Sequence, residues 1–442
     1  MTQRTTLRMA DGVAHETPIS APAGRTPLTI LLSAYACEPG KGSEPGVGWY
    51  WAVNLAAIGH SVWVLTRANN CALIETALAA EARENLHFIY YDLPPWMRWW
   101  KRRGHGVQLY YLFWQWGAYR VARKLCMQMR FDVIHHITFG VFRHPSFLAF
   151  LGVPFVFGPV GGGEAAPLSL RSTFHWRGRM ADRLRDFANW TVCVNPLMRA
   201  VFRNTAVTLC KTAETLQKIP PRYRSQCMIQ LELATESAAG AIVRRLRPAG
   251  SGLRVLYVGR LVYWKGLHLG LMAFAQLLRS EQHATLTVIG AGRDERWLRT
   301  LAHDLGVEEA VTWRGRIDRL SVIAAYADHD VLLFPSLHDS SGNVVLEALR
   351  AGVPVVCIDT GGPGAIIDAS CGLKIPAGRA HDVITGLGDA LQRLAQEPSL
   401  AARLSAGAMA RAGGEFSWAS RMASVEAVYR ALHTASVEAK VT

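Results

Sequence analysis

Two pairs of charged residues in the second half of the chain have types and spacing suited to chemistry. Arg260 and Lys265 follow a short apolar run, while Asp339 and Glu347 have seven residues between them and flank a Gly-Asn turn. The basic pair offers fixed positive charge for a diphosphate. The carboxylates could hold sugar hydroxyls, and the helix that the turn opens offers unpaired N–H groups to an anion. Binding phosphate and polyol in one place suggests a nucleotide-sugar.

A plainer interpretation of Arg260 and Lys265 makes them solvated surface charges. Their place at the end of an apolar run, with Gly259 and Gly266 beside them, favours a phosphate ligand. Residues 328–330, Asp-His-Asp, resemble a metal-binding motif. However, they lie where a helix ends and a strand begins, and structural roles at these two ends suffice to explain the three residues. We therefore predict no metal site and no cofactor, with the nucleotide-sugar as a substrate.

Two glycine-rich loops in the first half could approach a ligand. The loop 37–49, with Gly46 among its four glycines, follows an apolar run and opens a helix-like one. It matches no nucleotide-binding glycine pattern, so a plain connection is the alternative. The loop 157–167 carries Glu164 and would either line the acceptor side of a cleft or form a tight turn.

Two adjacent histidines lie near the end of the apolar run 131–139. His135 and His136 would sit at the carboxyl end of a strand, which is the edge where open α/β sheets bind ligands. Because side chains alternate along a strand, only one of the two can face a given cleft wall. The alternative for each is a buried, hydrogen-bonded histidine.

The elements that must position these residues follow one rhythm. Short apolar runs alternate with helix-like runs in both halves, which predicts an α/β fold with two doubly wound parallel sheets. The strand-like runs include 28–36, 61–67 and 131–139 in the first half and 253–260, 284–292 and 330–337 in the second.

Breaks in this rhythm divide the chain. A polar segment opens the sequence, and a Pro-, Gly- and Ser-containing stretch separates the two halves. We predict a flexible leader at 1–26, an N-terminal Rossmann-like domain at 27–235, a linker at 236–252, a C-terminal Rossmann-like domain at 253–413 and a final helix at 414–436.

Composition indicates a globular protein of a reducing compartment. The chain has 442 residues, of which 50% are hydrophobic, and a net charge of +14. Its eight cysteines form no C-x-x-C pair and no cluster with zinc spacing. The first residues lack the apolar core of a signal peptide, and Pro and Gly interrupt the apolar stretch 147–163. We therefore expect a cytoplasmic protein.

The segment 96–130 is basic and rich in tryptophan, with eight Lys or Arg and no Asp or Glu. No nucleic-acid-binding motif accompanies it, so we predict no nucleic-acid partner. A plain core helix would explain the aromatic residues and leave the clustered charge unexplained. Peripheral contact with the anionic inner face of the cell membrane explains both, because Trp prefers the interface and Lys and Arg meet lipid phosphates.

These features together resemble the retaining glycosyltransferases of family 4, in a bacterial polysaccharide-type branch. VGRLVYWKG at 258–266 looks like the family's phosphate segment, and PSLHDSSGNVVLE at 335–347 looks like its E-x7-E segment. The loops 36–49 and 158–163 and the HHITFG stretch at 135–140 resemble that branch. The resemblance covers nearly the whole chain after the leader. It implies the GT-B fold, in which two Rossmann-like domains face across a cleft and the last helix crosses back to the N-terminal domain.

The resemblance also implies roles for matching positions. Arg260 and Lys265 would bind the diphosphate and stabilise its charge as the glycosidic bond breaks. Glu347 would accept hydrogen bonds from the ribose hydroxyls. Asp339 would contact the donor sugar, but the family usually has Glu there, which leaves the sugar open. One of His135 and His136 would lie near the reacting sugar. Further donor-binding positions are Gly46, Gly259, Arg314, Gly342, Asn343 and Val344.

The implied activity is sugar transfer, with retention of configuration, from a nucleotide-sugar to a glycan or lipid-linked glycan in exopolysaccharide or lipopolysaccharide synthesis. The sequence shows no carboxylate pair of the hydrolase type. The resemblance implies instead that the departing phosphate deprotonates the acceptor. One alternative is a catalytically silent nucleotide-sugar-binding or scaffold protein, which the Asp339 departure supports. Another is an epimerase or phosphorylase on the same architecture.

Overall fold

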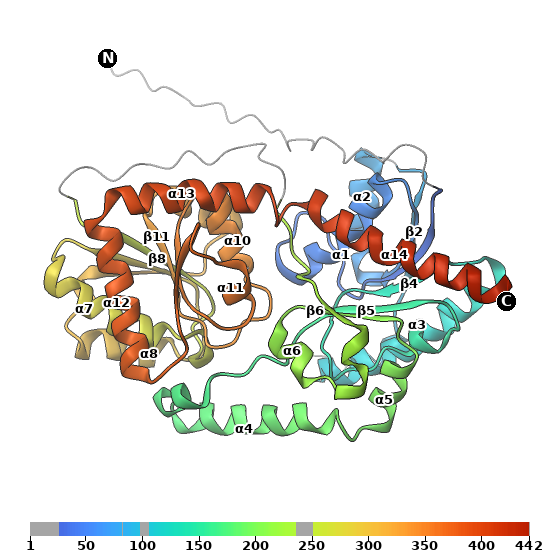
Figure 1. Cartoon of the computed structure of the whole chain (residues 1–442), viewed down its shortest axis with the longest axis horizontal. Coiled ribbons are helices and arrows are strands. Elements are labelled where there is room, and N and C mark those ends of the chain that lie inside the picture. Colours follow the sequence, from blue (N-terminus) through green and yellow to red (C-terminus); the bar gives the residue numbers. More distant parts are fainter. Residues whose placement is uncertain (1–25, 82, 98–105, 236–250, 442) are drawn as a thin grey trace, which may run out of the picture.

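The structure is a computed structural model that describes residues 26–81, 83–97, 106–235 and 251–441. It consists of two lobes, each built around one parallel β-sheet with helices on both faces (Figure 1). The predicted leader and most of the predicted linker lie outside the described residues. The predicted fold class, with two doubly wound parallel sheets, is confirmed.

The N-terminal lobe contains a seven-stranded sheet in the order β3-β2-β1-β4-β5-β6-β7, in which all neighbouring strands are parallel. Both faces are covered, which is why its strands read as apolar runs rather than alternating ones. The order reverses between β1 and β4, and a crevice at such a point is where open sheets bind ligands. The strands are β1 (Thr29–Ser33), β2 (Ser61–Arg67), β3 (Leu86–Tyr91), β4 (Val133–His136), β5 (Phe155–Val160), β6 (Val207–Cys210) and β7 (Cys227–Ile229).

Helices pack on this sheet from both sides. One face is covered largely by α3, which inserts Tyr110 and Trp114 into the core, and the other by α1, which inserts Trp51. The helices of this half are α1 (Ser43–Ala57), α2 (Cys71–Ala80), α3 (Val107–Gln128), α4 (Trp176–Thr191), α5 (Pro196–Arg203) and α6 (Ala213–Lys218).

The C-terminal lobe repeats the plan with a six-stranded sheet in the order β10-β9-β8-β11-β12-β13. Its strands are β8 (Arg254–Val258), β9 (Thr285–Ile289), β10 (Val311–Gly315), β11 (Val331–Phe334), β12 (Val355–Ile358) and β13 (Gly372–Ile375). Its helices are α7 (Leu267–Ser280), α8 (Glu295–Asp304), α9 (Arg319–Ala327), α10 (Asn343–Arg350), α11 (Gly361–Ile366), α12 (Ala380–Gln396) and α13 (Pro398–Gly413).

The last helix, α14 (Trp418–Val441), leaves the C-terminal lobe and runs across the N-terminal lobe (Figure 1). Met422, Val425 and Tyr429 pack into the same core cluster as Trp51. This helix follows the course that the family resemblance implies. None of the helices in the described part of the chain combines the length and apolar character needed to cross a membrane.

One segment of the first half packs with the second half. Ala166, Leu170 and Phe174 belong to the core cluster of the C-terminal lobe, together with Tyr263 and Leu267. The helix that follows, α4, runs beneath both lobes (Figure 1). The prediction of one domain at 27–235 did not include this packing. The alternation of apolar and helix-like runs indicates where helices and strands lie, but not which hydrophobic core each of them joins.

Four histidines, of which three are buried and His144 is half-buried, give the fold a pH dependence. Burial lowers the pKa of His135 and His268 to about 3 and that of His136 and His144 to about 4. In the unfolded chain an imidazole titrates near about 6.5. Below that pH the unfolded chain binds protons that the folded chain does not, so acidification favours unfolding.

We expect the free energy of unfolding to fall as the pH decreases from about 6.5 toward 4, with each of these imidazoles contributing up to about 1.4 kcal/mol per pH unit. Urea denaturation at several pH values would measure the slope. His268→Gln removes one titrating group and should flatten the slope. An unchanged slope in this variant would contradict the assignment.

Candidate functional site

The carboxyl ends of strands from both sheets meet at one gap. Gly161 follows β5 and lies so close to the loop after β11 that a Cβ atom on it would be 2.9 Å from Cβ of Ser340. The Gly361 N–H at the start of α11 donates to Oε1 of Glu214 on α6 at 2.8 Å. The lobes therefore touch directly at the edge where parallel sheets place their ligands.

A pocket between the lobes contains three of the residues predicted to bind a donor. Gly46 lies on its N-terminal wall, and Asn343 and Glu347 lie on its C-terminal wall. The other charged and aromatic residues around it are Lys41, Tyr50, Arg319, Arg350 and Trp418. The sequence analysis did not single out Arg319, which lies at the start of α9 and brings positive charge to this wall.

Glu347 presents a carboxylate to this pocket from α10. Its Oε2 accepts a hydrogen bond from the hydroxyl of Tyr326 at 3.2 Å. Burial raises the pKa of Glu347, while the nearby Arg319 and the bond from Tyr326 act in the opposite direction. A carboxylate on a pocket wall, held by one neighbour and with acceptor capacity left, is suited to bonding a vicinal diol.

The start of α10 supplies two further features. Gly342 adopts φ of 73°, which favours glycine, and a Cβ atom on it would also lie 2.8 Å from Cδ1 of Ile366, so that side chain would have to shift. The Asn343 Oδ1 atom is buried and has no hydrogen-bond partner among the described residues. Val344, next along, accepts from the Tyr326 hydroxyl through its carbonyl at 3.3 Å. The unpartnered oxygen indicates a place for a donor group of a ligand.

Lys265 and Asp339 meet although 74 residues separate them. The Lys265 ammonium forms an ion pair with Oδ2 of Asp339, and both side chains are mostly buried. The Asp339 Oδ1 atom faces the backbone N–H groups of Ser341 and Gly342 at 3.3 and 3.4 Å. The basic and acidic motifs therefore form one cluster, in which Asp339 holds Lys265 as well as the turn before α10.

Arg260 is exposed and lies over an aromatic stack. Its guanidinium carbon is 5.7 Å from the centroid of the Trp264 ring, and that ring stacks on His338 at 5.5 Å. Nη1 of Arg185 on α4 lies 2.5 Å from Nε2 of His338, so α4 also reaches this cluster. Gly259, just before Arg260, donates its N–H to the carbonyl of Ile289 at 3.0 Å.

Three of the predicted residues occupy other surroundings. Arg314 is exposed on the edge strand β10 and is not among the residues that line the pocket. His135 is fully buried, with Nδ1 at 2.5 Å from the Tyr429 hydroxyl and Nε2 at 2.6 Å from the Gly158 carbonyl oxygen. His136 lies 3.1 Å from the Tyr111 hydroxyl and from the Ser146 hydroxyl.

Both imidazoles therefore have each ring nitrogen engaged inside the N-terminal lobe. This arrangement differs from the expectation that one of them faces the cleft. The hydroxyls that engage them come from Tyr111 on α3, from Ser146 in the loop after β4, and from Tyr429 on α14, which is distant in sequence. In the structure both residues are buried, hydrogen-bonded histidines, which was the alternative to a histidine that faces the ligand.

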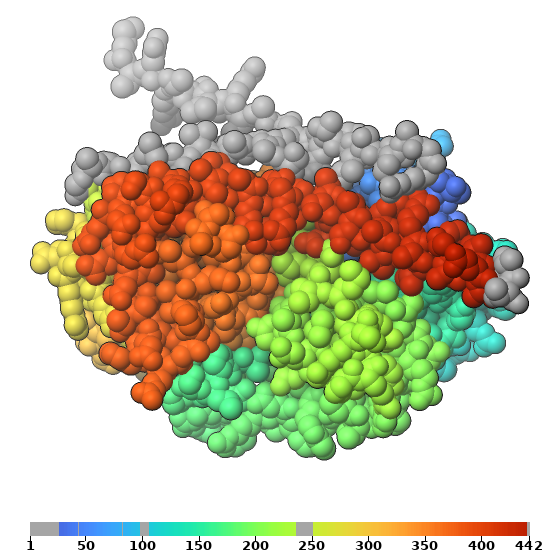
Figure 2. Space-filling view, viewed as in Figure 1, coloured from blue at the N-terminus to red at the C-terminus, as the bar shows by residue number. Residues whose placement is uncertain are grey.

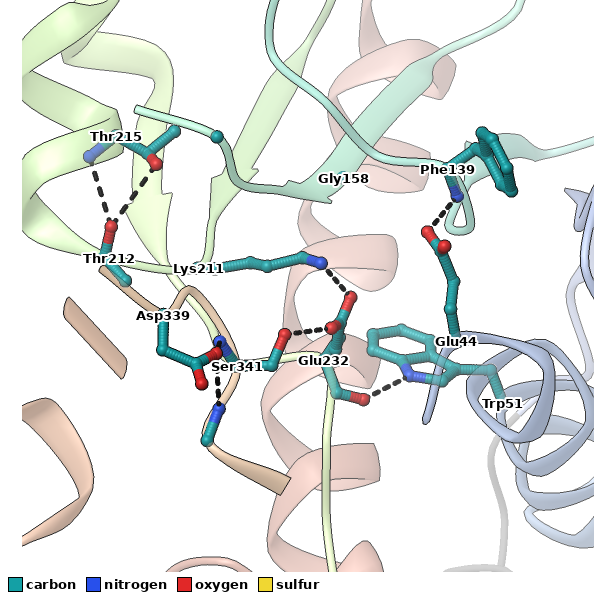
Figure 3. A network of polar contacts seen from close by, with 12 residues as sticks. Glu44, Trp51, Phe139, Gly158, Lys211, Thr212, Thr215, Glu232, Asp339 and Ser341 are labelled. Carbon is teal, nitrogen blue, oxygen red and sulfur yellow. Dashed lines mark hydrogen bonds and ion pairs between the residues drawn. The ribbon is translucent and has the colours of Figure 1, made fainter. Parts of the chain in front are cut away.

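A buried ionic network lies where the lobes meet (Figure 3). The Lys211 ammonium, at the end of β6, pairs with Oε2 of Glu232, whose Oε1 accepts from the Ser341 hydroxyl at 2.5 Å. Glu44 accepts from the Phe139 N–H at 2.5 Å on the other side of the network. Burial alone would lower the pKa of Lys211, but the carboxylates of Glu232 and Glu44 outweigh it and raise that pKa.

Sequence reasoning missed this network. Lys211 directly follows an apolar strand-like run, which is the signal that drew attention to Arg260 and to the two histidines. The second glycine loop is likewise fixed from within the N-terminal lobe, because Glu164 accepts from Thr212, Thr215 and the Gly162 N–H at 2.7 to 2.8 Å. Within the 328–330 triplet, Asp330 forms a salt bridge with Arg254, with 2.9 Å between Oδ1 of Asp330 and Nη2 of Arg254.

Comparison with known proteins agrees with this geometry. Residues 242–409 match the family described as Glycosyl transferases group 1. The glycogen synthase of Mycobacterium tuberculosis (strain ATCC 25618 / H37Rv) is 32% identical over 186 residues, which are 42% of this chain and 44% of that protein. The chain thus aligns with less than half the length of this relative.

Solved structures match over nearly the whole chain. Sucrose-phosphate synthase from Thermosynechococcus elongatus has a TM-score of 0.63 at 18% identity, covering 92% of this chain and 100% of that one. Anabaena Alr3699/HepE in complex with UDP and glucose has a TM-score of 0.56 at 14% identity, covering 94% and 99%. At such identities the likeness concerns the fold, which is GT-B.

Loss of the Lys211 ammonium should destabilise the protein. Lys211→Met leaves buried carboxylates without their counter-charge, which costs about 3–5 kcal/mol of unfolding free energy. Adding Glu232→Gln should cost less than the two single effects summed, because the second change removes a charge that the first left unpaired. Urea denaturation of the four forms measures the coupling.

The matched control is Arg299→Met, which breaks the exposed Arg299–Glu295 pair on α8 and the contact of Arg299 with the Trp313 ring, and it should cost no more than about 1 kcal/mol. Equal losses for Lys211→Met and Arg299→Met would show that the buried pair has no special weight.

Proposed function

We propose that this chain, whose residues 242–409 form a glycosyl transferases group 1 domain, transfers a sugar from a nucleotide-sugar to a glycan or lipid-linked glycan acceptor. The observation that supports this most is the pocket between the lobes. There Glu347 and the unpartnered Asn343 oxygen of the C-terminal lobe face Gly46 of the N-terminal lobe, and the Lys265–Asp339 pair lies in the C-terminal lobe as well.

The donor would span this part of the C-terminal lobe. Glu347 accepts hydrogen bonds from the ribose hydroxyls, as its place on the pocket wall allows. The diphosphate lies between the start of α10 and the Arg260–Lys265 segment, where N–H groups and two cations favour an anion. Lys265 then divides its charge between Asp339 and the phosphate.

The reaction would proceed with retention at the anomeric carbon. The bond between that carbon and the diphosphate oxygen breaks, and its electron pair leaves with the diphosphate. The acceptor oxygen bonds to the same carbon from the same face, and its proton passes to a phosphate oxygen. Asp339, Glu232 and Glu44 all contact protein groups already, so none is placed as a free nucleophile of the hydrolase kind.

The acceptor side is assigned to the N-terminal lobe, in a cytoplasmic protein in peripheral contact with the cell membrane. Of the basic, Trp-rich segment 96–130, residues 98–105 lie outside the described part. In α3, Trp114 is buried in the core, whereas Trp116 and Arg120 are exposed. The helix thus combines a core face with a basic and aromatic outer face. This outer face is suited to contact with a membrane that carries a lipid-linked glycan acceptor of exopolysaccharide or lipopolysaccharide type.

Removing the two cations should abolish transfer. Arg260→Ala combined with Lys265→Ala is expected to lower kcat by at least about a hundredfold, because each cation stabilises charge that develops on the departing diphosphate. The assay is release of nucleoside diphosphate from a panel of nucleotide-sugars. Arg279→Ala, at an exposed position on α7, is the control and should leave the rate unchanged.

Normal turnover in the double variant would refute these roles. A wild-type protein that is thermally stabilised by a nucleotide-sugar, yet releases no nucleotide with any acceptor, would favour the silent binder. Conversion of the donor without an acceptor would favour an epimerase.

We also expect nucleotide release to persist in excess EDTA, since Arg260 and Lys265 would supply the charge that a divalent cation supplies elsewhere. The same assay with and without EDTA checks this. Loss of activity that Mg²⁺ or Mn²⁺ restores would contradict it.

A further inference from the structure

The outer face of α4 carries a line of large apolar side chains, which we call the α4 ridge. Its five members are between 48% and 65% exposed. They follow one another at helical spacing of four, four, three and three residues, so they share one side of the helix. The α4 ridge consists of Trp176, Met180, Leu184, Phe187 and Trp190.

The opposite side of α4 is fixed to the protein, so the α4 ridge must face outward. Gly178, Asp182 and Asn189 are buried, and the Asp182 carboxylate accepts from the Tyr263 hydroxyl at 2.9 Å. A Cβ atom on Gly178 would lie 3.0 Å from the Tyr263 ring. Figure 2 shows this part of the chain, in green, along the lower edge of the molecule, where no other element covers it in that view.

The charges beside the α4 ridge are basic. Arg177, Arg179 and Arg183 are exposed on the same helix. The helix has two acidic residues, of which Asp182 is buried and Asp186 is paired with Arg171 at 2.5 Å. The surface that α4 offers is therefore apolar along its middle, with guanidinium groups beside it.

We propose that the α4 ridge inserts into the interfacial region of an anionic lipid membrane. A helix with an apolar face and basic flanks lies in the plane of such an interface, and tryptophan is favoured at its polar boundary. Trp176 and Trp190 stand at the two ends of the ridge, about 21 Å apart along the helix. The arginines meet lipid phosphates.

Charge favours a membrane over a second copy of this chain. Two α4 ridges packed face to face would bring the flanking arginines of both helices together, and the one partly exposed acidic residue of each α4, Asp186, is already paired with Arg171. An anionic lipid surface instead complements every one of these charges. A single exposed apolar residue needs no explanation, but five on one helix face form a contiguous patch of the kind that marks an interaction site.

This assignment is separate from the proposed contact of α3, and it does not depend on catalysis. It places a second membrane-facing helix on the segment that runs beneath both lobes (Figure 1). Because α4 contacts Tyr263 and His338 of the C-terminal lobe, the membrane would meet the protein beside both lobes.

The test is co-sedimentation of the full chain with vesicles of phosphatidylcholine, with or without phosphatidylglycerol. The wild type should bind the anionic vesicles, and salt should weaken the binding. Leu184→Glu should reduce the partition coefficient by roughly tenfold or more, because binding scales with apolar area buried in the interface. The matched control is Leu73→Glu, the same change at an exposed position on α2, which should bind like the wild type.

Two further variants separate the contributions. Arg179→Gln with Arg183→Gln should weaken binding to anionic vesicles by about fivefold per arginine and leave binding to phosphatidylcholine unchanged. Trp116→Glu changes the exposed face of α3. A loss of binding in Trp116→Glu together with full binding in Leu184→Glu would overturn the proposal in favour of α3.

Other outcomes are equally decisive. Wild-type vesicle binding by a folded Leu184→Glu, checked by circular dichroism and thermal melting, would overturn the proposal. So would a dimer in the wild type that Leu184→Glu dissociates, measured by sedimentation velocity. Nucleotide release is scored independently, so loss of vesicle binding with normal release supports the α4 assignment without testing the proposed chemistry.

Discussion

Glu232 holds the two lobes together at the base of their gap. Its carboxylate pairs with the Lys211 ammonium of the N-terminal lobe and accepts from Ser341 in the turn before α10, while its backbone carbonyl accepts from the Trp51 indole at 2.9 Å. A buried ion pair stabilises only when further hydrogen bonds complete it, and these contacts do so. The position of the α10 turn, and with it the donor side of the gap, therefore depends on a residue that lies shortly before the predicted linker.

The fold and the donor side could be predicted because both follow from local sequence. Alternating apolar and amphipathic runs specify parallel sheets. The Gly-Asn turn, the first glycine loop and the family resemblance indicated Glu347, Asn343 and Gly46, which the structure places around one pocket. The contact between Lys265 and Asp339 was not predicted, although both residues were. Each follows a strand of the same sheet, β8 and β11, which are neighbours.

The remaining features depend on contacts between distant parts of the chain. His135 and His136 lie at the predicted strand end, but the Tyr111 hydroxyl of α3 engages His136, and the hydroxyl of Tyr429, 294 residues further along the chain, engages His135. The outward face of α4 has a related cause. Its apolar spacing is typical of a helix that buries that side, whereas Gly178 and Asp182 show that the other side is buried against Tyr263.

The packing of Ala166, Leu170 and Phe174 among the apolar residues of the C-terminal lobe has a consequence for biogenesis. During synthesis these three side chains leave the ribosome before Tyr263 and Leu267. They therefore stay exposed to solvent or bound to a chaperone until the residues they pack against have been synthesised. Neither lobe is a self-contained unit of assembly. An isolated fragment starting at residue 251 would lack part of its hydrophobic core and would expose an apolar surface prone to aggregation.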